Sequence, residues 1–171
     1  ERHGCLVGSE MCIRDSLTLI AMNQEGYKNL LELLSLGWLK GQEGDYALLE
    51  WEWVIEHSAG LICLTGATEG EIGRLVAAGQ IDKADAVLDK YHAVFADRLY
   101  VELTRVGLSG ETALTHYAIQ AADQRLIPLV ATNVACFQDA DDFEAHETRV
   151  CIHDSVTLDD QRRFHRHTPE Q

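Results

Sequence analysis

The chain has 171 residues, of which 46% are hydrophobic and 25% charged, so it is long enough for one globular domain with a real core. Its formal net charge of −14 argues against direct binding of a phosphate backbone, although a longer protein could carry a basic groove elsewhere. No stretch approaches the roughly 18 consecutive apolar residues of a membrane span, and we expect a cytoplasmic protein without a membrane partner.

The first 16 residues have no clear periodicity and do not lead into a regular element. Residues 5–16 resemble the translated adapter read-through found at the ends of environmental gene fragments. We therefore set residues 1–16 aside as a non-native artefact. The alternative is a native, disordered terminus.

Residues 17–22 form an apolar run that predicts a strand buried on both faces. Asn23 is placed to cap the helix that follows, and Gly37 to end it. The expected core stripe of this helix has the spacing i, i+3, i+4, i+7 and consists of Tyr27, Leu30, Leu31 and Leu34.

Two further runs, 60–66 and 98–104, predict buried strands. Glu102 lies inside the second of them. A carboxylate in such a strand can act as a general base or a metal ligand. It can equally be a structural ion paired with the nearby Arg105.

Helical segments separate these strands. A short helix is expected over 48–57, where Trp51 and Trp53 suit core and interface packing better than stacking on bases. The stripe of the next long helix comprises Ile81, Ala84, Leu88, Tyr91 and Phe95, and that of a later helix comprises Leu114, Tyr117, Ala118 and Ala121.

Near the end of the chain, residues 126–131 read as another buried strand, with Pro128 near its start. A helix follows from Asp139 to about residue 154. Asp142 stands three residues after Asp139, at the spacing of a capping box. The loop 133–138 between strand and helix would lie at the carboxyl ends of the strands, where a β/α barrel builds its chemistry.

The alternation of strands and helices predicts an α/β fold with a parallel sheet or barrel. There is no P-loop and no G-x-S-x-G nucleophile elbow. An odd set of five cysteines without a Cys-x-x-Cys pair supports neither a disulfide scaffold nor a zinc ribbon. From the residues alone, the function is unreadable.

Five segments carry a resemblance that goes further, namely 17–35, 60–75, 98–107, 127–133 and 145–160. They are similar to the PHP (polymerase and histidinol phosphatase) domain of bacterial DNA polymerase III α subunits. The resemblance implies a distorted, TIM-like β/α barrel, of which residues 17–160 would be a part lacking the first strands. Residues 161–171 would then be a linker or tail towards polymerase domains.

Active PHP sites hold a cluster of divalent metals through several His and carboxylate ligands. In the resemblance, Val134 and Cys136 stand where such sites have Asp and His. Ala67 and Val106 also stand where active relatives place coordinating side chains. The resemblance therefore implies a degenerate site, with no catalytic residue, no metal ligand and no cofactor in this segment.

The implied parent is a DNA-directed DNA polymerase for replication that uses Mg²⁺ and binds DNA through domains outside this chain. The implied role of the segment is to dock the proofreading exonuclease subunit, alongside other replicase subunits. Two alternatives stay open. One is an active metal-dependent PHP phosphoesterase or 3′–5′ exonuclease, and the other is the PHP domain of an error-prone accessory polymerase.

Overall fold

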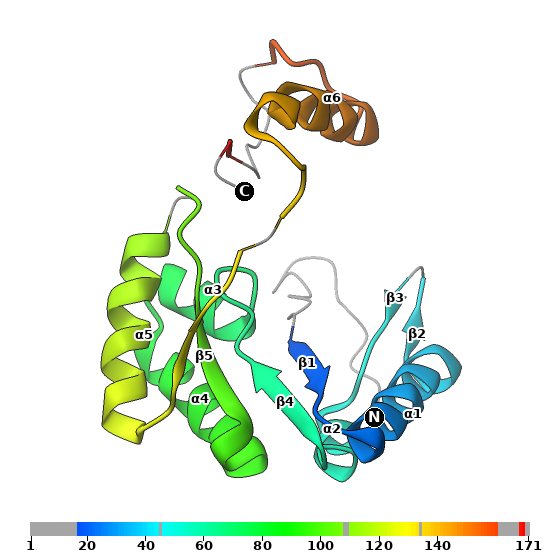
Figure 1. Ribbon diagram of the computed structural model, residues 1–171, viewed down its shortest axis with the longest axis vertical. Helices are drawn as coiled ribbons and strands as arrows, with labels where there is room; N and C mark the ends of the chain where they lie inside the picture. Colours follow the sequence, from blue (N-terminus) through cyan, green and yellow to red (C-terminus); the bar gives the residue numbers. More distant parts are fainter. Residues whose placement is uncertain (1–16, 45, 108–109, 134, 161–167, 170–171) are drawn as a thin grey trace, which may run out of the picture.

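The computed structural model describes residues 17–44, 46–107, 110–133, 135–160 and 168–169 (Figure 1). The predictions for residues 1–16, Val134 and most of the 161–171 tail lie outside these ranges. The strands are β1 (Thr18–Ala21), β2 (Gln42–Glu43), β3 (Tyr46–Ala47), β4 (Leu61–Leu64), β5 (Leu99–Leu103) and β6 (Leu129–Ala131). The helices are α1 (Gln24–Lys40), α2 (Trp51–Glu56), α3 (Glu71–Ala77), α4 (Ile81–Phe95), α5 (Glu111–Arg125) and α6 (Phe143–Asp154), with 3₁₀ turns at Ala96–Arg98 and Ala140–Asp142. None of the helices in the described ranges is long and apolar enough to cross a bilayer.

The main sheet has the order β1-β4-β5-β6. The pairs β4–β5 and β5–β6 are parallel, as the alternating pattern predicts. β1 is antiparallel to β4, with Thr18 opposite Leu64 and Ala21 opposite Leu61, so the expectation of a wholly parallel sheet is wrong at this edge. The described strands form an open sheet with two edges, and the α/β class is confirmed while the barrel stays a prediction.

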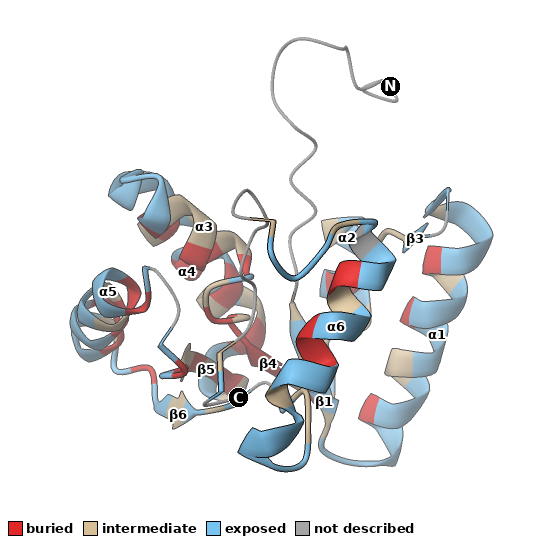
Figure 2. Ribbon diagram, turned by 90° about the horizontal axis from the view of Figure 1, so that it is seen from above, coloured by how far each residue is buried: buried red, intermediate tan, exposed pale blue. Residues whose placement is uncertain are grey.

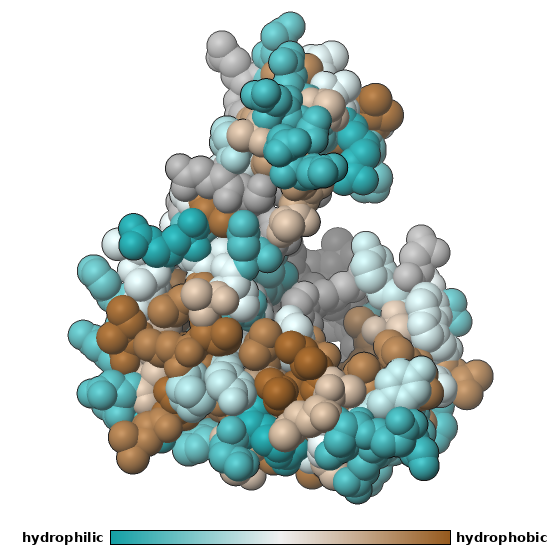
Figure 3. Space-filling view, viewed as in Figure 1, coloured by the Kyte–Doolittle hydropathy of each residue, from teal (hydrophilic) through white to brown (hydrophobic). Residues whose placement is uncertain are grey.

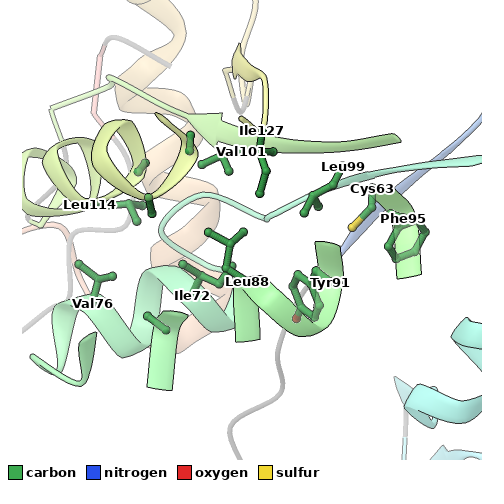
Figure 4. Packing of buried hydrophobic residues seen from close by; sticks show 14 of the residues in the cluster. Cys63, Ile72, Val76, Leu88, Tyr91, Phe95, Leu99, Val101, Leu114 and Ile127 are labelled. Atoms are coloured by element: carbon green, nitrogen blue, oxygen red, sulfur yellow. The ribbon is translucent and has the colours of Figure 1, made fainter. Parts of the chain in front are cut away.

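One face of the sheet is covered by α3, α4 and α5 (Figure 2). Alternate residues of β4 and β5 point into this layer because side chains on a strand alternate between its faces. The predicted stripe of α4 is confirmed from Ala84 to Phe95, whereas Ile81 at its start is 41% exposed. Figure 4 shows the strand residues Cys63, Leu99 and Val101 directed at this helix layer.

The opposite face of the sheet is open. Ile20 of β1 lies opposite Ile62 of β4, and Tyr100 and Glu102 of β5 share their side of the sheet. Ile20 is 46% exposed, and the other three are only half-buried. Figure 3 shows hydrophobic residues in a band on the left of this view, where α5 and the strands lie in Figure 1.

Both edge strands differ from the sequence prediction. The run 17–22 was expected to be buried on both faces, but only alternate residues of β1 face the core. The run 126–131 shortens to β6, whose Leu129 is 42% exposed. Leu126 ends α5 in a left-handed conformation and is 90% exposed. An apolar run therefore identified each strand but did not distinguish a central position from an edge.

Of the predicted stripe of helix α1, only Leu30 packs against the core. The buried residues of the helix are Gly26, Leu33 and Gly37, whereas Tyr27 and Leu34 are each 50% exposed. Gly26 packs closely against Gly60 on this side. A Cβ at position 26 would lie 1.9 Å from the carbonyl oxygen of Gly60, so only glycine permits this close approach. Gly37 does not end the helix, which continues to Lys40.

The two predicted helix starts are confirmed by their capping bonds. The side chain of Asn23 accepts a hydrogen bond of 2.9 Å from the backbone N–H of Gly26. Asp139 and Asp142 form the predicted capping box. This box begins a single 3₁₀ turn, however, and α6 itself begins at Phe143.

Candidate functional site

Three threonines stand in equivalent places at the carboxyl edge of the parallel strands. Thr65 follows β4 directly, Thr104 follows β5 and Thr132 follows β6. Because the carboxyl ends of parallel strands meet at one edge of a sheet, the three side chains gather around Glu102. This is the place where a barrel of this class would build a site.

The carboxylate of Glu102 connects the ends of all three strands. One oxygen, Oε2, accepts a hydrogen bond of 2.9 Å from the backbone N–H of Gly66, just after β4. The other, Oε1, accepts a bond of 2.6 Å from the hydroxyl of Thr132, just after β6. The backbone N–H of Glu102 donates to the hydroxyl of Thr65 at 3.0 Å. Glu102 therefore braces β5 against both of its neighbours.

The direction of the neighbouring hydrogen bond follows from a proton count. A threonine hydroxyl has one proton, and an ionised carboxylate can only accept. Since Thr132 donates to Glu102, its 3.3 Å contact with the hydroxyl of Thr104 requires Thr104 to be the donor. The result is a relay from Thr104 through Thr132 to Glu102, in which both hydroxyl protons are directed towards the carboxylate.

These contacts favour the structural interpretation of Glu102. A backbone N–H and a hydroxyl hold its carboxylate, rather than Arg105, whose side chain is exposed. A charge-assisted bond of this kind is typically about twice as strong as a neutral one. Both carboxylate oxygens are already engaged in joining strands, so the arrangement has the chemistry of a brace.

The β5–α5 loop contains a second carboxylate that the sequence reasoning did not identify. Glu111 is only 8% exposed, and its oxygens accept hydrogen bonds from the backbone N–H groups of Val106, at 3.1 Å, and Gly107, at 3.0 Å. Val106 itself is buried, and its carbonyl oxygen accepts a hydrogen bond from the hydroxyl of Thr168. This carboxylate fixes the loop that carries Val106.

The structure describes three of the four positions that are predicted to be degenerate. Ala67 and Val106 are buried at the carboxyl edge, and Ala67 has a positive φ of 46° in the loop after β4. Cys136 is a half-buried free thiol, and Val134 lies outside the described ranges. No structural observation relates Cys136 to Ala67 and Val106 as members of one site.

The donor set at this edge does not suit a divalent metal cluster. The described residues at this edge supply threonine hydroxyls, the engaged carboxylates of Glu102 and Glu111, and apolar side chains, rather than the several imidazoles and carboxylates that such a cluster needs. Within the residues that the structure describes, no group of three or more His, Cys, Asp or Glu could hold a metal ion. We therefore derive no metal-dependent step for this edge.

Cys63 lies near Glu102 but on the covered face of the sheet. Burial, reinforced by the negative charge of Glu102, raises the pKa of its thiol from 9.0 to about 12. The thiolate is the reactive form of cysteine, so this side chain is a chemically inert part of the core at neutral pH.

The two tryptophans of α2 are packing residues, as expected. Trp51 stacks on Tyr91 of α4 at a centroid distance of 5.2 Å, and the ammonium group of Lys90 lies 4.3 Å from the Trp51 ring centroid. Trp53 faces the other way and lines a hollow between α1 and α2. Trp51 thus joins α2 to the core, and Trp53 joins it to α1.

A signal for the threonine cluster was present in the sequence. The pairs Leu64-Thr65, Leu103-Thr104 and Ala131-Thr132 each place a threonine directly after the last apolar residue of a predicted strand. Three such repeats in a parallel sheet indicate a shared polar edge. Glu111 had no comparable signal, because its partners are backbone groups whose positions depend on the fold of the loop.

Comparison with known proteins gives consistent matches. The family model described as PHP domain matches residues 3–106. The chain is 45% identical to the DNA polymerase III subunit alpha of Pseudomonas aeruginosa over 155 residues, which are 91% of this chain and 13% of that protein. The corresponding protein of Vibrio cholerae is 41% identical, with the same coverage. That of Escherichia coli K12 is 39% identical over 97% of this chain and 14% of its own length.

The chain thus spans about one-seventh or less of the length of these curated relatives. The matched family model covers more than half of the chain and includes β1, β4 and β5 together with Glu102. The match to the Escherichia coli protein extends over nearly all of the rest of the chain. The chain therefore belongs to the PHP domain family.

Proposed function

We propose that this chain is a PHP module of a bacterial replicative DNA polymerase III α subunit. The name that its relatives share, DNA polymerase III subunit alpha, supports this assignment. In the proposed parent, polymerisation belongs to Mg²⁺-dependent domains outside the chain. Those domains also bind DNA, since a segment with a net charge of −14 is a poor partner for phosphates. The barrel geometry of the family is part of the same proposal.

Within that parent, we propose that the module is non-catalytic and serves as a docking platform for the proofreading exonuclease subunit. The observation that carries the first part is the brace at Glu102, where the carboxylate of the strand edge is engaged by Gly66 and Thr132. The apolar residues Ala67 and Val106, buried in the loops that follow β4 and β5, support the same interpretation. With hydrolysis disfavoured, a protein–protein role is the remaining function that the family resemblance supplies.

Deletion of this module from the full α subunit tests the proposal. We expect the shortened subunit to lose binding of the purified exonuclease subunit while it still extends a primer, which serves as the control for folding. The complete PHP domain should not cleave single-stranded DNA in the presence of Zn²⁺ or Mn²⁺. Unchanged exonuclease binding would refute the docking role, and metal-dependent cleavage would revive the phosphoesterase alternative.

A further inference from the structure

The end of helix α2 is joined to α1 by a histidine. His57 follows directly after the six residues of α2 and is its C-cap. The Nε2 atom of His57 lies 3.1 Å from Oε2 of Glu32 on α1. The Nδ1 atom of the same ring lies 2.8 Å from the carbonyl oxygen of Trp53 within α2. Both ring nitrogens are thus engaged, one by α2 itself and the other by the neighbouring helix.

The partners of the two nitrogens determine how many protons the ring carries. A carbonyl oxygen and an ionised carboxylate can only accept hydrogen bonds, so Nδ1 and Nε2 must both donate. A neutral imidazole has one N–H group, and its second nitrogen would direct a lone pair at one of these oxygens. The imidazolium form has an N–H group on each nitrogen. The contacts of His57 therefore require the doubly protonated, positively charged ring.

The hollow between α1 and α2 contains the charges that act on this ring. Its charged lining residues, besides His57, are Glu32 and Lys40 of α1 and Glu56 of α2. The two carboxylates favour an imidazolium, whereas the ammonium group opposes it. The side chain of His57 is 18% exposed and that of Glu32 is 64% exposed, so water screens the bridge in part.

Other hydrogen bonds hold the loop that follows α2, and their donors keep the same charge around neutral pH. The guanidinium of Arg98, in the 3₁₀ turn before β5, donates to the carbonyl oxygens of Ser58 and Leu61. The side-chain amide of Asn29 on α1 donates to the carbonyl oxygen of Ala59 at 2.8 Å. A guanidinium stays charged and an amide stays neutral at these pH values. Among these attachments, the histidine bridge is the one that a single proton can make or break.

We propose that His57 is a proton-dependent bridge that joins the end of α2 to α1. Histidine is the side chain that changes its charge between about pH 5 and 8, and carboxylates stay ionised above about pH 6. On the acidic side of this window the ring carries both protons and binds Glu32. As the pH rises, the ring loses one proton and one of its two hydrogen bonds. The end of α2 then separates from α1 more often, so proton concentration controls the local opening of this helix.

Hydrogen exchange of the full-length protein, followed by mass spectrometry, measures this local opening. The readout is the protection of the backbone amides in a peptide that covers residues 51–61, corrected for the intrinsic pH dependence of exchange. In the wild type, we expect protection to be about two- to fivefold lower at pH 8 than at pH 6, as for a partly exposed ion pair. His57→Gln has no titrating ring and should show the same protection at both pH values.

Two further variants separate the bridge from a general loss of packing. Glu32→Gln keeps a side-chain oxygen but removes the charge, so it should reduce protection at pH 6 and abolish most of the pH dependence. The matched control is Asn29→Ala, which removes an uncharged hydrogen bond between α1 and the same loop. It should reduce protection equally at both pH values and leave the pH dependence of the wild type intact.

The pH dependence of α2 decides the proposal. Equal protection of the wild type at pH 6 and pH 8 would overturn it. It is also overturned if Glu32→Gln retains the full pH dependence, because another group would then be responsible. If His57→Gln leaves α2 unprotected at both pH values, Glu32→Gln still gives the answer, since this exposed side chain can be replaced without removing the histidine.

Discussion

The two faces of the main sheet differ in what covers them, although both carry apolar residues. On the face towards α3, α4 and α5, Cys63 and Leu99 are fully buried and Val101 is 3% exposed. On the other face, Ile20 is 46% exposed and Tyr100 is half-buried. The same strands supply both sets, so the difference arises from the helices and not from the strand sequences.

This difference sets how much each face of the sheet contributes to stability. The covered face supplies most of the apolar burial, at roughly 25 cal/mol for each Å² removed from water. The open face contributes less and carries Glu102 together with its threonines at the carboxyl edge.

The largest effect is expected from truncation on the covered side. Leu88→Ala removes a side chain that is 1% exposed and should lower the free energy of unfolding by about 2–5 kcal/mol. Ile20→Ala on the open face should cost about 1 kcal/mol, because much of that side chain is already in water. Urea unfolding followed by tryptophan fluorescence gives both values. Equal losses would mean that the open face is also covered in solution.

The next effect sharpens the role of the open face. Glu102→Ala should cost about 1–3 kcal/mol, because the N–H of Gly66 and the hydroxyl of Thr132 lose their acceptor. Glu102→Gln keeps one side-chain oxygen and should lose less. A double-mutant cycle with Thr132→Val, read by urea unfolding, should show coupling between the two residues. Strictly additive losses would contradict the brace.

A smaller, pH-dependent effect comes from Cys63 on the covered face. Its folded pKa of about 12 lies above the ordinary value of 9.0, so the folded state holds this proton more tightly than the unfolded state. The resulting stability is fully present below pH 9 and is lost as the pH rises towards 12. The stability difference between the wild type and Cys63→Ala should therefore shrink over that window.

Alkylation at pH 8 offers an independent check on Cys63. The shift of the pKa from 9.0 to about 12 leaves roughly a thousandfold less thiolate in the folded state, so iodoacetamide should modify Cys63 only after unfolding. The half-buried Cys136 serves as the internal comparison in the same digest. Rapid modification of Cys63 in the native protein would show that the covered face opens readily.

The smallest effect is expected from metal. The degenerate positions predict that the complete domain retains no stoichiometric zinc or manganese after dialysis, and that EDTA does not shift its unfolding midpoint. Val134→Asp combined with Cys136→His should not create a site, because Ala67 and Val106 supply no ligand either. Elemental analysis after dialysis measures the bound zinc and manganese, and a near-integral metal content would overturn the prediction.

Much of the fold could be predicted from local patterns. Apolar runs identified the four strands of the main sheet, and the spacing of Ala84, Leu88, Tyr91 and Phe95 identified the buried side of α4. Asn23 and Asp139 marked real capping bonds. These features depend on neighbours within a few residues in the chain, which is why the sequence contains them.

The tertiary structure decided which apolar residues are used for the core. Helix α1 has two apolar sides, and the close approach of Gly26 to Gly60 selects the one that packs, leaving Tyr27 and Trp38 about half exposed. The sequence placed Glu102 in a strand and offered Arg105 beside it as a counter-ion. Only the parallel pairing of β5 with its neighbours brings in Gly66, 36 positions away, and Thr132, 30 positions away. Sequence patterns predict the structure of a residue's near neighbours in the chain. The partners of the Glu102 carboxylate depend instead on which strands lie side by side.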